Sequence, residues 1–130
     1  MKFSYRHSVL EDEGGIVLAA EFKLTPASAE DVKAKMKELQ AKRSASQPLD
    51  LPSAGSAFKR PVGGYAAALI DQTGLKGFQV GGAAVSEKHA GFVVNLGGAT
   101  AADVRELLQQ VSDKVYDRTG IRLEPEVRIW

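Results

Sequence analysis

Three short segments, far apart along the chain, carry side chains that could handle an acidic ligand. Arg6 lies in the run Tyr-Arg-His-Ser at residues 5–8, and its planar guanidinium suits a carboxylate or a phosphate. Ser56 follows Gly55, whose missing side chain lets the backbone turn tightly and expose the neighbouring hydroxyl. That hydroxyl can donate a hydrogen bond as well as accept one. Glu126 adds a carboxyl that can act as an acid in a closed site. Together these groups could hold an acidic substrate and deliver a proton to it.

Taken singly, each of these residues has a more ordinary structural explanation. Arg6 would be a surface arginine before a strand, Ser56 a loop serine that caps a turn, and Glu126 a partner in a cross-strand ion pair. A serine–histidine triad is poorly supported, because Gly-x-Ser-x-Gly is absent and only His7 and His89 could serve as a base. The chemical interpretation therefore rests on the order and spacing of the three segments together.

Other polar residues are secondary candidates for the same ligand. His89 is expected to make a polar contact at a turn, or a ligand contact. No second histidine or carboxylate stands at metal spacing from it, so we expect no metal site. Lys59 and Arg60 closely follow Ser56 and could meet a phosphate, although exposed basic residues are common on loops. The chain has no cysteine, which excludes disulfides, thiolate metal sites and cysteine nucleophiles.

Composition and charge place the chain among ordinary globular proteins. It has 130 residues, of which 44% are hydrophobic and 25% charged, as expected for one compact domain or a piece of a larger protein. The net charge of +1 gives no general attraction to nucleic acid or to an anionic membrane. No apolar run is long enough to cross a bilayer. We therefore expect a soluble, cytoplasmic protein with no nucleic-acid or membrane partner.

The pattern of apolar residues predicts both strands and helices. Strands are predicted at residues 16–24 (buried on much of both faces), 78–80, 83–85, 92–96, 121–124 and 126–130. Helices are predicted from Ser28 to about Arg43, from Tyr65 to about Gln72, and from Thr100 to about Thr119, with a capping box at the start of the first and third. Each of these two helices has one apolar stripe, formed in the first by Val32, Met36 and Leu39 and in the third by Val104, Leu107, Leu108, Val111 and Val115. Residues 44–55 lack periodicity and read as a long loop. The layout predicts an α+β fold, a mostly antiparallel sheet with two or three helices packed on it.

Seen as a set, the segments resemble one enzyme family, UDP-N-acetylenolpyruvoylglucosamine reductase, in its C-terminal part. The most specific strings are Val-Ser-Glu-Lys-His-Ala at residues 85–90 and Leu-Glu-Pro-Glu-Val-Arg at residues 123–128. The matching pieces run in the family's order across essentially the whole chain, at residues 5–8, 55–61, 67–77, 81–95 and 123–128.

The resemblance implies a division of the chain and a function. Residues 1–25 would be the last piece of an FAD-binding domain, and residues 26–130 a substrate-binding C-terminal domain. The family uses FAD and NADPH to reduce UDP-N-acetylglucosamine enolpyruvyl ether in peptidoglycan precursor synthesis, and so serves cell-wall biogenesis, cell shape, the cell cycle and cell division. Because most of the flavin domain is missing, we expect this chain alone to hold no flavin, to be inactive, and to risk self-association through a bare sheet edge.

The resemblance also implies roles for individual residues. Ser56 matches the proton donor, Arg6 the residue that polarises the substrate carboxylate, and Glu126 the acid that helps to stabilise the enol intermediate. Weaker matches, assigned to contact with the diphosphate, substrate or flavin, are Tyr5, Lys59, Arg60, His89 and Arg128. An alternative from another class stays open, in which the chain is a stand-alone module that binds a uridine nucleotide sugar without redox activity.

Overall fold

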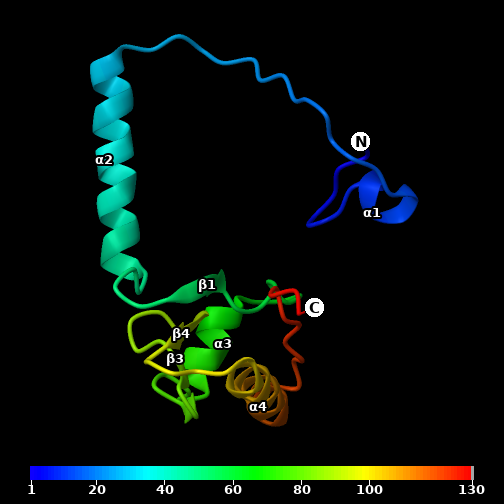
Figure 1. Cartoon of the computed structure of the whole chain (residues 1–130), viewed down its shortest axis with the longest axis vertical. Coiled ribbons are helices and arrows are strands. Elements are labelled where there is room, and N and C mark those ends of the chain that lie inside the picture. The colour runs from blue at the N-terminus through cyan, green and yellow to red at the C-terminus, as the bar shows by residue number, and fades with distance from the viewer. Residues whose placement is uncertain (130) are drawn as a thin grey trace. The chain divides into compact units, whose positions relative to one another are not determined.

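The computed structural model describes residues 1–129 and contains two compact units, Met1–Lys33 and Ala34–Trp130. Each unit is described by itself. Over the described residues the elements are four helices and a four-stranded antiparallel sheet (Figure 1). The predicted α+β fold class is thereby confirmed. The assignment of residues 1–25 to the end of an FAD-binding domain and of residues 26–130 to a substrate-binding domain stays a prediction.

The first unit contains a tight turn and one short helix. Ser4 and His7 form an isolated antiparallel bridge, and α1 (Val9–Glu13) follows directly. Sequence patterns did not predict α1, because five residues are too few to show a helical period.

The predicted strand at residues 16–24 is wrong. These residues form no strand, and Ile16, Leu18 and Phe22 are 87%, 94% and 79% exposed. An apolar run becomes a strand only when a neighbouring strand satisfies its backbone groups, and the described residues of the first unit provide none.

The predicted helix after Ser28 is confirmed as α2 (Ala29–Ser46), which begins in the first unit and ends in the second. The Ser28 hydroxyl accepts a hydrogen bond from the Asp31 N–H at 3.1 Å, as an N-cap residue does. The apolar stripe predicted on this helix exists but lies open to solvent, since its residues Val32, Met36 and Leu39 are all exposed.

The sheet belongs to the second unit and has the strand order β1-β4-β3-β2. Its strands are β1 (Ser53–Ser56), β2 (Gln79–Val80), β3 (Ala83–Val85) and β4 (Phe92–Asn95), and each neighbouring pair is antiparallel. The strands predicted at 78–80, 83–85 and 92–96 are confirmed within a residue or two. β1 is a correction, because its residues were predicted to lie in a loop. The sequence Ser-Ala-Gly-Ser has little strand propensity of its own, so β1 exists through its pairing with β4.

Two helices of the second unit, α3 (Ala66–Gln72) and α4 (Ala101–Thr119), contact one another, and α4 also contacts β2 and β3. Both were predicted. The capping box at the start of α4 is present, and Gly120 ends the helix in the left-handed conformation with φ of 72°. The pKa of Asp103 is lowered, chiefly because the Thr100 N–H donates to its carboxylate and secondarily because the Gly82 N–H does.

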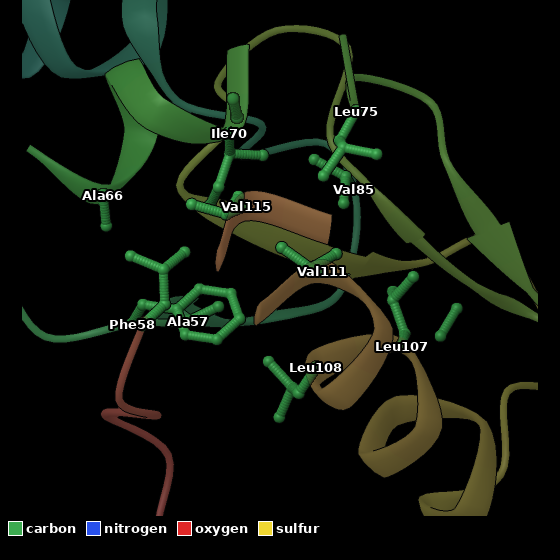
Figure 2. Close-up of a cluster of buried hydrophobic side chains, with 13 residues drawn as sticks. Ala57, Phe58, Ala66, Ile70, Leu75, Val85, Leu107, Leu108, Val111 and Val115 are labelled. Atoms are coloured by element: carbon green, nitrogen blue, oxygen red, sulfur yellow. The ribbon is translucent and has the colours of Figure 1, made fainter. Parts of the chain in front are cut away.

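The core of the second unit lies where α4 meets the sheet and α3. The predicted stripe of α4 is its centre, with Leu107, Val111 and Val115 fully buried. Figure 2 shows Ala57 and Phe58, just after β1, in the same cluster as Leu108 and Val111. The segment that carries Ser56 is therefore anchored in the core immediately beyond the serine.

The strands predicted at residues 121–124 and 126–130 are wrong. Among the described residues of this segment the structure has a single antiparallel bridge, between Pro125 and Phe58. Proline has no backbone N–H, so the ladder cannot continue through it. Trp130 lies outside the described residues.

Candidate functional site

The chain brings the predicted residues Ser56 and Glu126 to neighbouring positions in the second unit. The N–H of Glu126 donates to the carbonyl of Ala57 at 2.9 Å, and the N–H of Lys59 donates to the carbonyl of Glu124 at 2.8 Å. These two bonds flank the Phe58–Pro125 bridge. The carboxyl-bearing residue is thus hydrogen-bonded to the residue that directly follows the serine.

The two side chains differ in exposure. Ser56 is exposed, whereas Ala57 after it is buried, so the serine stands on the solvent side of an extended segment. Glu126 is half-buried, and its Oε2 atom is shielded from solvent. An accessible hydroxyl and a partly enclosed carboxyl on hydrogen-bonded neighbouring segments are groups that can donate protons or hydrogen bonds to a ligand.

His89 joins this arrangement through the backbone. Its Nδ1 accepts from the Gly91 N–H at 3.1 Å, and its ring meets Phe92 edge-on with centroids 4.9 Å apart. The Gly91 carbonyl in turn accepts from the Ala57 N–H at 2.8 Å. Because Nδ1 is an acceptor, the proton of the neutral ring lies on Nε2. The turn that carries His89 is therefore tied to the Ser56 segment.

The basic residues after Ser56 have partners of their own. The Lys59 ammonium pairs with the Glu124 carboxylate. The Arg60 guanidinium lies over the ring of Tyr65, 4.0 Å from its centroid, in a cation–π contact. Tyr65 was not singled out from the sequence, although an aromatic residue shortly after a basic pair was a usable signal. Arg128 is exposed, two residues beyond Glu126.

Arg6 and Tyr5 lie in the first unit. They are the two central residues of the turn that the Ser4–His7 bridge closes, and both are exposed. Arg6 has φ of 56°, a conformation that residues other than glycine seldom adopt. The structure thus brings Ser56, Glu126 and His89 together within one unit and describes Arg6 in the other. Convergence of Arg6 on Ser56 and Glu126 stays a prediction.

Two grooves of the second unit bear on the question of a cofactor. One, of about 360 Å³, adjoins β1 and is lined almost wholly by apolar groups, including Ala54, Val93 and Val127. A larger one, of about 1120 Å³, runs along α4 and mixes the carboxylates of Glu106 and Glu124 with basic groups. Neither lining has the cluster of donors that the diphosphate of a flavin requires, so these described grooves do not fit that cofactor.

The described residues contain neither a metal-binding cluster nor a membrane-spanning helix. Nowhere in residues 1–129 do three or more histidine, cysteine, aspartate or glutamate side chains gather in a way that could hold a metal ion. Within the same residues, no helix combines the length and the apolar character needed to cross a membrane.

The second unit is an α+β domain with a short antiparallel sheet, a serine at the end of its edge strand and a glutamate hydrogen-bonded to the next residue. Residues 47–130 match the family model described as UDP-N-acetylenolpyruvoylglucosamine reductase, C-terminal domain. This match covers more than half of the chain, and the chain belongs to that reductase family.

Individual relatives agree with the family match. The chain is 52% identical over 129 residues to the UDP-N-acetylenolpyruvoylglucosamine reductase of Latilactobacillus sakei, covering 99% of this chain and 43% of the relative. It is 53% identical to the Agathobacter rectalis reductase, of which it covers 41%. The crystal structure of the Thermus caldophilus reductase is similar with a TM-score of 0.64 at 40% identity, over 82% of this chain and 38% of that one. The chain therefore spans about two fifths of the length of these relatives.

Proposed function

We propose that this chain is the substrate-binding and proton-delivering part of an NADPH- and FAD-dependent reductase. The reaction would convert UDP-N-acetylglucosamine enolpyruvyl ether to UDP-N-acetylmuramate in peptidoglycan precursor synthesis. The observation that carries this proposal is the hydrogen bond from the Glu126 N–H to the Ala57 carbonyl, which sets a carboxyl beside the Ser56 segment. Family membership and the resemblance of the residue strings support it.

The proposed chemistry assigns one task to each of three side chains. Reduction of the enolpyruvyl double bond adds a hydride to the methylene carbon and a proton to the neighbouring carbon; when bound, a reduced flavin supplies the hydride. Arg6 would bind the substrate carboxylate, towards which negative charge moves. Ser56 would give its hydroxyl proton to the neighbouring carbon, and Glu126 would stabilise the enol form of the substrate. Donors fixed in advance where charge develops account for much of such catalysis.

The secondary residues would hold the rest of the substrate or the cofactor. We assign contacts with the diphosphate, substrate or flavin to Tyr5, Lys59, Arg60, His89 and Arg128. Loss of an arginine that pairs with a buried charge costs about 2–5 kcal/mol of binding free energy. The stacking of Arg60 on Tyr65 limits the orientations of its guanidinium and favours this role.

The flavin belongs to the whole enzyme in this proposal. Residues 1–25 would be the end of an FAD-binding domain and residues 26–130 the substrate domain, so we expect the 130-residue chain to stay colourless when FAD is added. A stoichiometric yellow complex would contradict that expectation. The location would be the cytoplasm, and the product would feed cell-wall synthesis and thus cell shape and division.

A chimera tests the proposed roles. The matching segment of the Latilactobacillus sakei reductase would be replaced by this chain, and flavin absorbance would be followed by stopped-flow spectroscopy. With Ser56→Ala we expect normal flavin reduction by NADPH and a fall of at least about 100-fold in reoxidation by the enolpyruvyl substrate, because general acid catalysis contributes roughly 10²–10⁴-fold.

The matched control is Ser53→Ala, which removes a hydroxyl from the same exposed strand. This variant should leave both half-reactions within about twofold of the unmodified chimera, since its hydroxyl has no proposed part in proton delivery. Normal reoxidation in Ser56→Ala would refute the proton-donor role. An unmodified chimera that reduces its flavin but never reduces the substrate would refute the proposed function itself.

A second candidate function is a stand-alone module that binds a uridine nucleotide sugar. The observation that favours it is the separate core of the second unit, which includes Leu107, Val111 and Val115. Calorimetric titration of the chain with UDP-N-acetylglucosamine distinguishes the candidates. Micromolar binding without flavin would favour the module, whereas binding only in the chimera would favour the reductase.

A further inference from the structure

The turn that presents Arg6 is held in a costly backbone conformation. Ser4 and His7 exchange two backbone hydrogen bonds, Ser4 N–H to His7 O at 3.0 Å and His7 N–H to Ser4 O at 3.4 Å. Arg6 between them has φ of 56°. A side chain at positive φ crowds its own backbone, so such a residue persists only where surrounding contacts fix it. The two backbone bonds close this exposed turn, and a contact to the helix that follows would fix it further.

The ring of His7 supplies that further contact. Its Nδ1 lies 2.7 Å from Oε2 of Glu11, and its Nε2 lies 3.1 Å from Oδ2 of Asp12. Ionised carboxylates only accept hydrogen bonds, so both ring nitrogens must carry a proton to satisfy both partners. The geometry therefore belongs to the imidazolium form. Both carboxylates stand on α1, which starts two residues after His7, and the ring fastens the turn to that helix.

We propose that His7 is a positioning residue for Arg6. Its doubly protonated ring clamps the Tyr5–Arg6 turn to Glu11 and Asp12. The clamp thereby fixes the direction in which the Arg6 guanidinium meets the substrate carboxylate. This inference rests on the proposed function, because it takes the carboxylate-binding role of Arg6 from there. The charged groups that face the ring are Glu11 and Asp12, both from α1.

The clamp depends on pH in a definite direction. The pKa of His7 is raised above its ordinary value of 6.5 by the hydrogen bond to Glu11 first and that to Asp12 second, against a smaller opposing effect of burial. A group whose pKa is raised in the folded state contributes stability below its unfolded pKa and loses it as pH rises through the folded pKa. The clamp is thus complete below the ordinary pKa of 6.5 and is lost as pH rises through the raised pKa of the His7 ring.

Nuclear magnetic resonance on the 130-residue chain tests the clamp without needing activity. Two quantities are followed against pH: the ring shifts of His7, and the three-bond HN–Hα coupling of Arg6, which reports its φ. We expect both to change with one common midpoint. Glu11→Gln and Asp12→Asn should each lower that midpoint and move the Arg6 transition with it. A ring that titrates while the Arg6 coupling stays constant would overturn the proposal.

Two substitutions at position 7 complete the test. His7→Phe removes both hydrogen bonds and should abolish the positive-φ coupling of Arg6 at every pH. His7→Lys keeps a cation beside the two carboxylates and should retain the coupling while removing its dependence on pH near neutrality. Unchanged Arg6 coupling in His7→Phe would also overturn the proposal.

These outcomes separate the positioning role from the proposed function. UDP-N-acetylmuramate, which carries the product carboxylate, is titrated into the chain at pH values on either side of the His7 midpoint. Binding that weakens at least about threefold above the midpoint, in the wild type but not in His7→Lys, supports the inference. Equal affinity at both pH values refutes the positioning role. If the chain alone does not bind, the titration is repeated with the chimera, where absence of binding in the presence of a normal, titrating turn refutes the substrate role of Arg6.

Discussion

The turn around Arg6 and the pair formed by Ser56 and Glu126 are built in opposite ways. The contacts described above for the Arg6 turn join residues at most five positions apart, such as His7 with Glu11 and Asp12. The Ser56 region depends on hydrogen bonds between segments at opposite ends of the second unit, and Lys59 and Glu124 are 65 positions apart. The Arg6 turn is therefore formed by local, exposed contacts, whereas the pairing of the Ser56 and Glu126 segments exists only when the whole second unit is folded.

This difference predicts how each region responds to substitutions and to changes of pH. Local exposed contacts open individually at low cost, whereas contacts that share a core open with the global unfolding of that core. Deprotonation of His7 or a single substitution should release the Arg6 turn without unfolding the second unit. The Ser56–Glu126 pairing should instead fail in proportion to the stability lost from the core.

The largest expected effect comes from Phe58→Ala. Phe58 is 5% exposed and its backbone is bridged to Pro125, so the substitution leaves a cavity at the point where the two segments meet. We expect the free energy of unfolding of the second unit to fall by about 3–5 kcal/mol, measured by urea denaturation followed by circular dichroism. Phe22→Ala, at a 79% exposed position of the first unit, is the control and should change little. Similar urea-denaturation midpoints for Phe58→Ala and Phe22→Ala would contradict the anchoring of the Ser56 segment in the core.

A smaller effect is expected from Ser112→Ala. The buried Ser112 hydroxyl donates to the Leu123 carbonyl at 2.9 Å and so steadies the backbone three residues before Glu126. Leaving that buried carbonyl unsatisfied should cost about 1–3 kcal/mol. Urea denaturation gives the stability, and hydrogen exchange of the Glu126 amide should speed up by the corresponding factor. Ser46→Ala, on the exposed helix α2, is the matched serine control. Faster exchange at Glu126 without loss of global stability would show that the pairing opens locally after all.

The smallest effect is expected from Lys59→Met. The Lys59–Glu124 ion pair is exposed, with side chains 40% and 70% accessible, and pairs of this kind contribute about 0.2–1 kcal/mol. The loss should shrink as salt is added, because mobile ions already screen the pair. Glu124→Gln should give the same change, and the double variant should add nothing further. A loss above about 2 kcal/mol would mean that the side-chain pair, rather than the backbone pairing, holds the segments together.

Much of the second unit could be predicted from the sequence. Helix α4 has a strong helical period of apolar residues, a capping residue at Thr100 and a terminating glycine at Gly120. Each of these three signals depends only on neighbouring residues along the chain. β3 and β4 were visible as short apolar runs. The polar residues Ser56 and Glu126 could be named in advance, and the structure places their segments side by side.

The rest could not be predicted, for reasons that lie outside local sequence. β1 is formed by Ser-Ala-Gly-Ser, which becomes a strand only through β4. Conversely, residues 16–24 have the composition of a buried strand and lack a partner among the described residues of their unit. The single bridge at Pro125 follows from the missing N–H of proline, although the residues around it have strand character. In the first two cases the deciding factor is whether another segment is present to complete the hydrogen bonds, and in the third it is whether the residue itself can donate one.

The β2–β3 turn packs closely against the segment that leads into α4, and this contact limits how α4 can shift when interior residues are substituted. A Cβ atom on Gly82 would lie 2.5 Å from the backbone nitrogen of Ala99 and 2.6 Å from the carbonyl oxygen of Gly97. Main chain meets main chain there, and the Asp103 carboxylate also accepts hydrogen bonds from the N–H groups of Gly82 and Thr100 across the contact. We therefore expect this end of the helix to tolerate little displacement when the volume of interior residues changes. The adjustment is expected instead at the opposite end of α4, close to Leu123 and the segment that leads to Glu126.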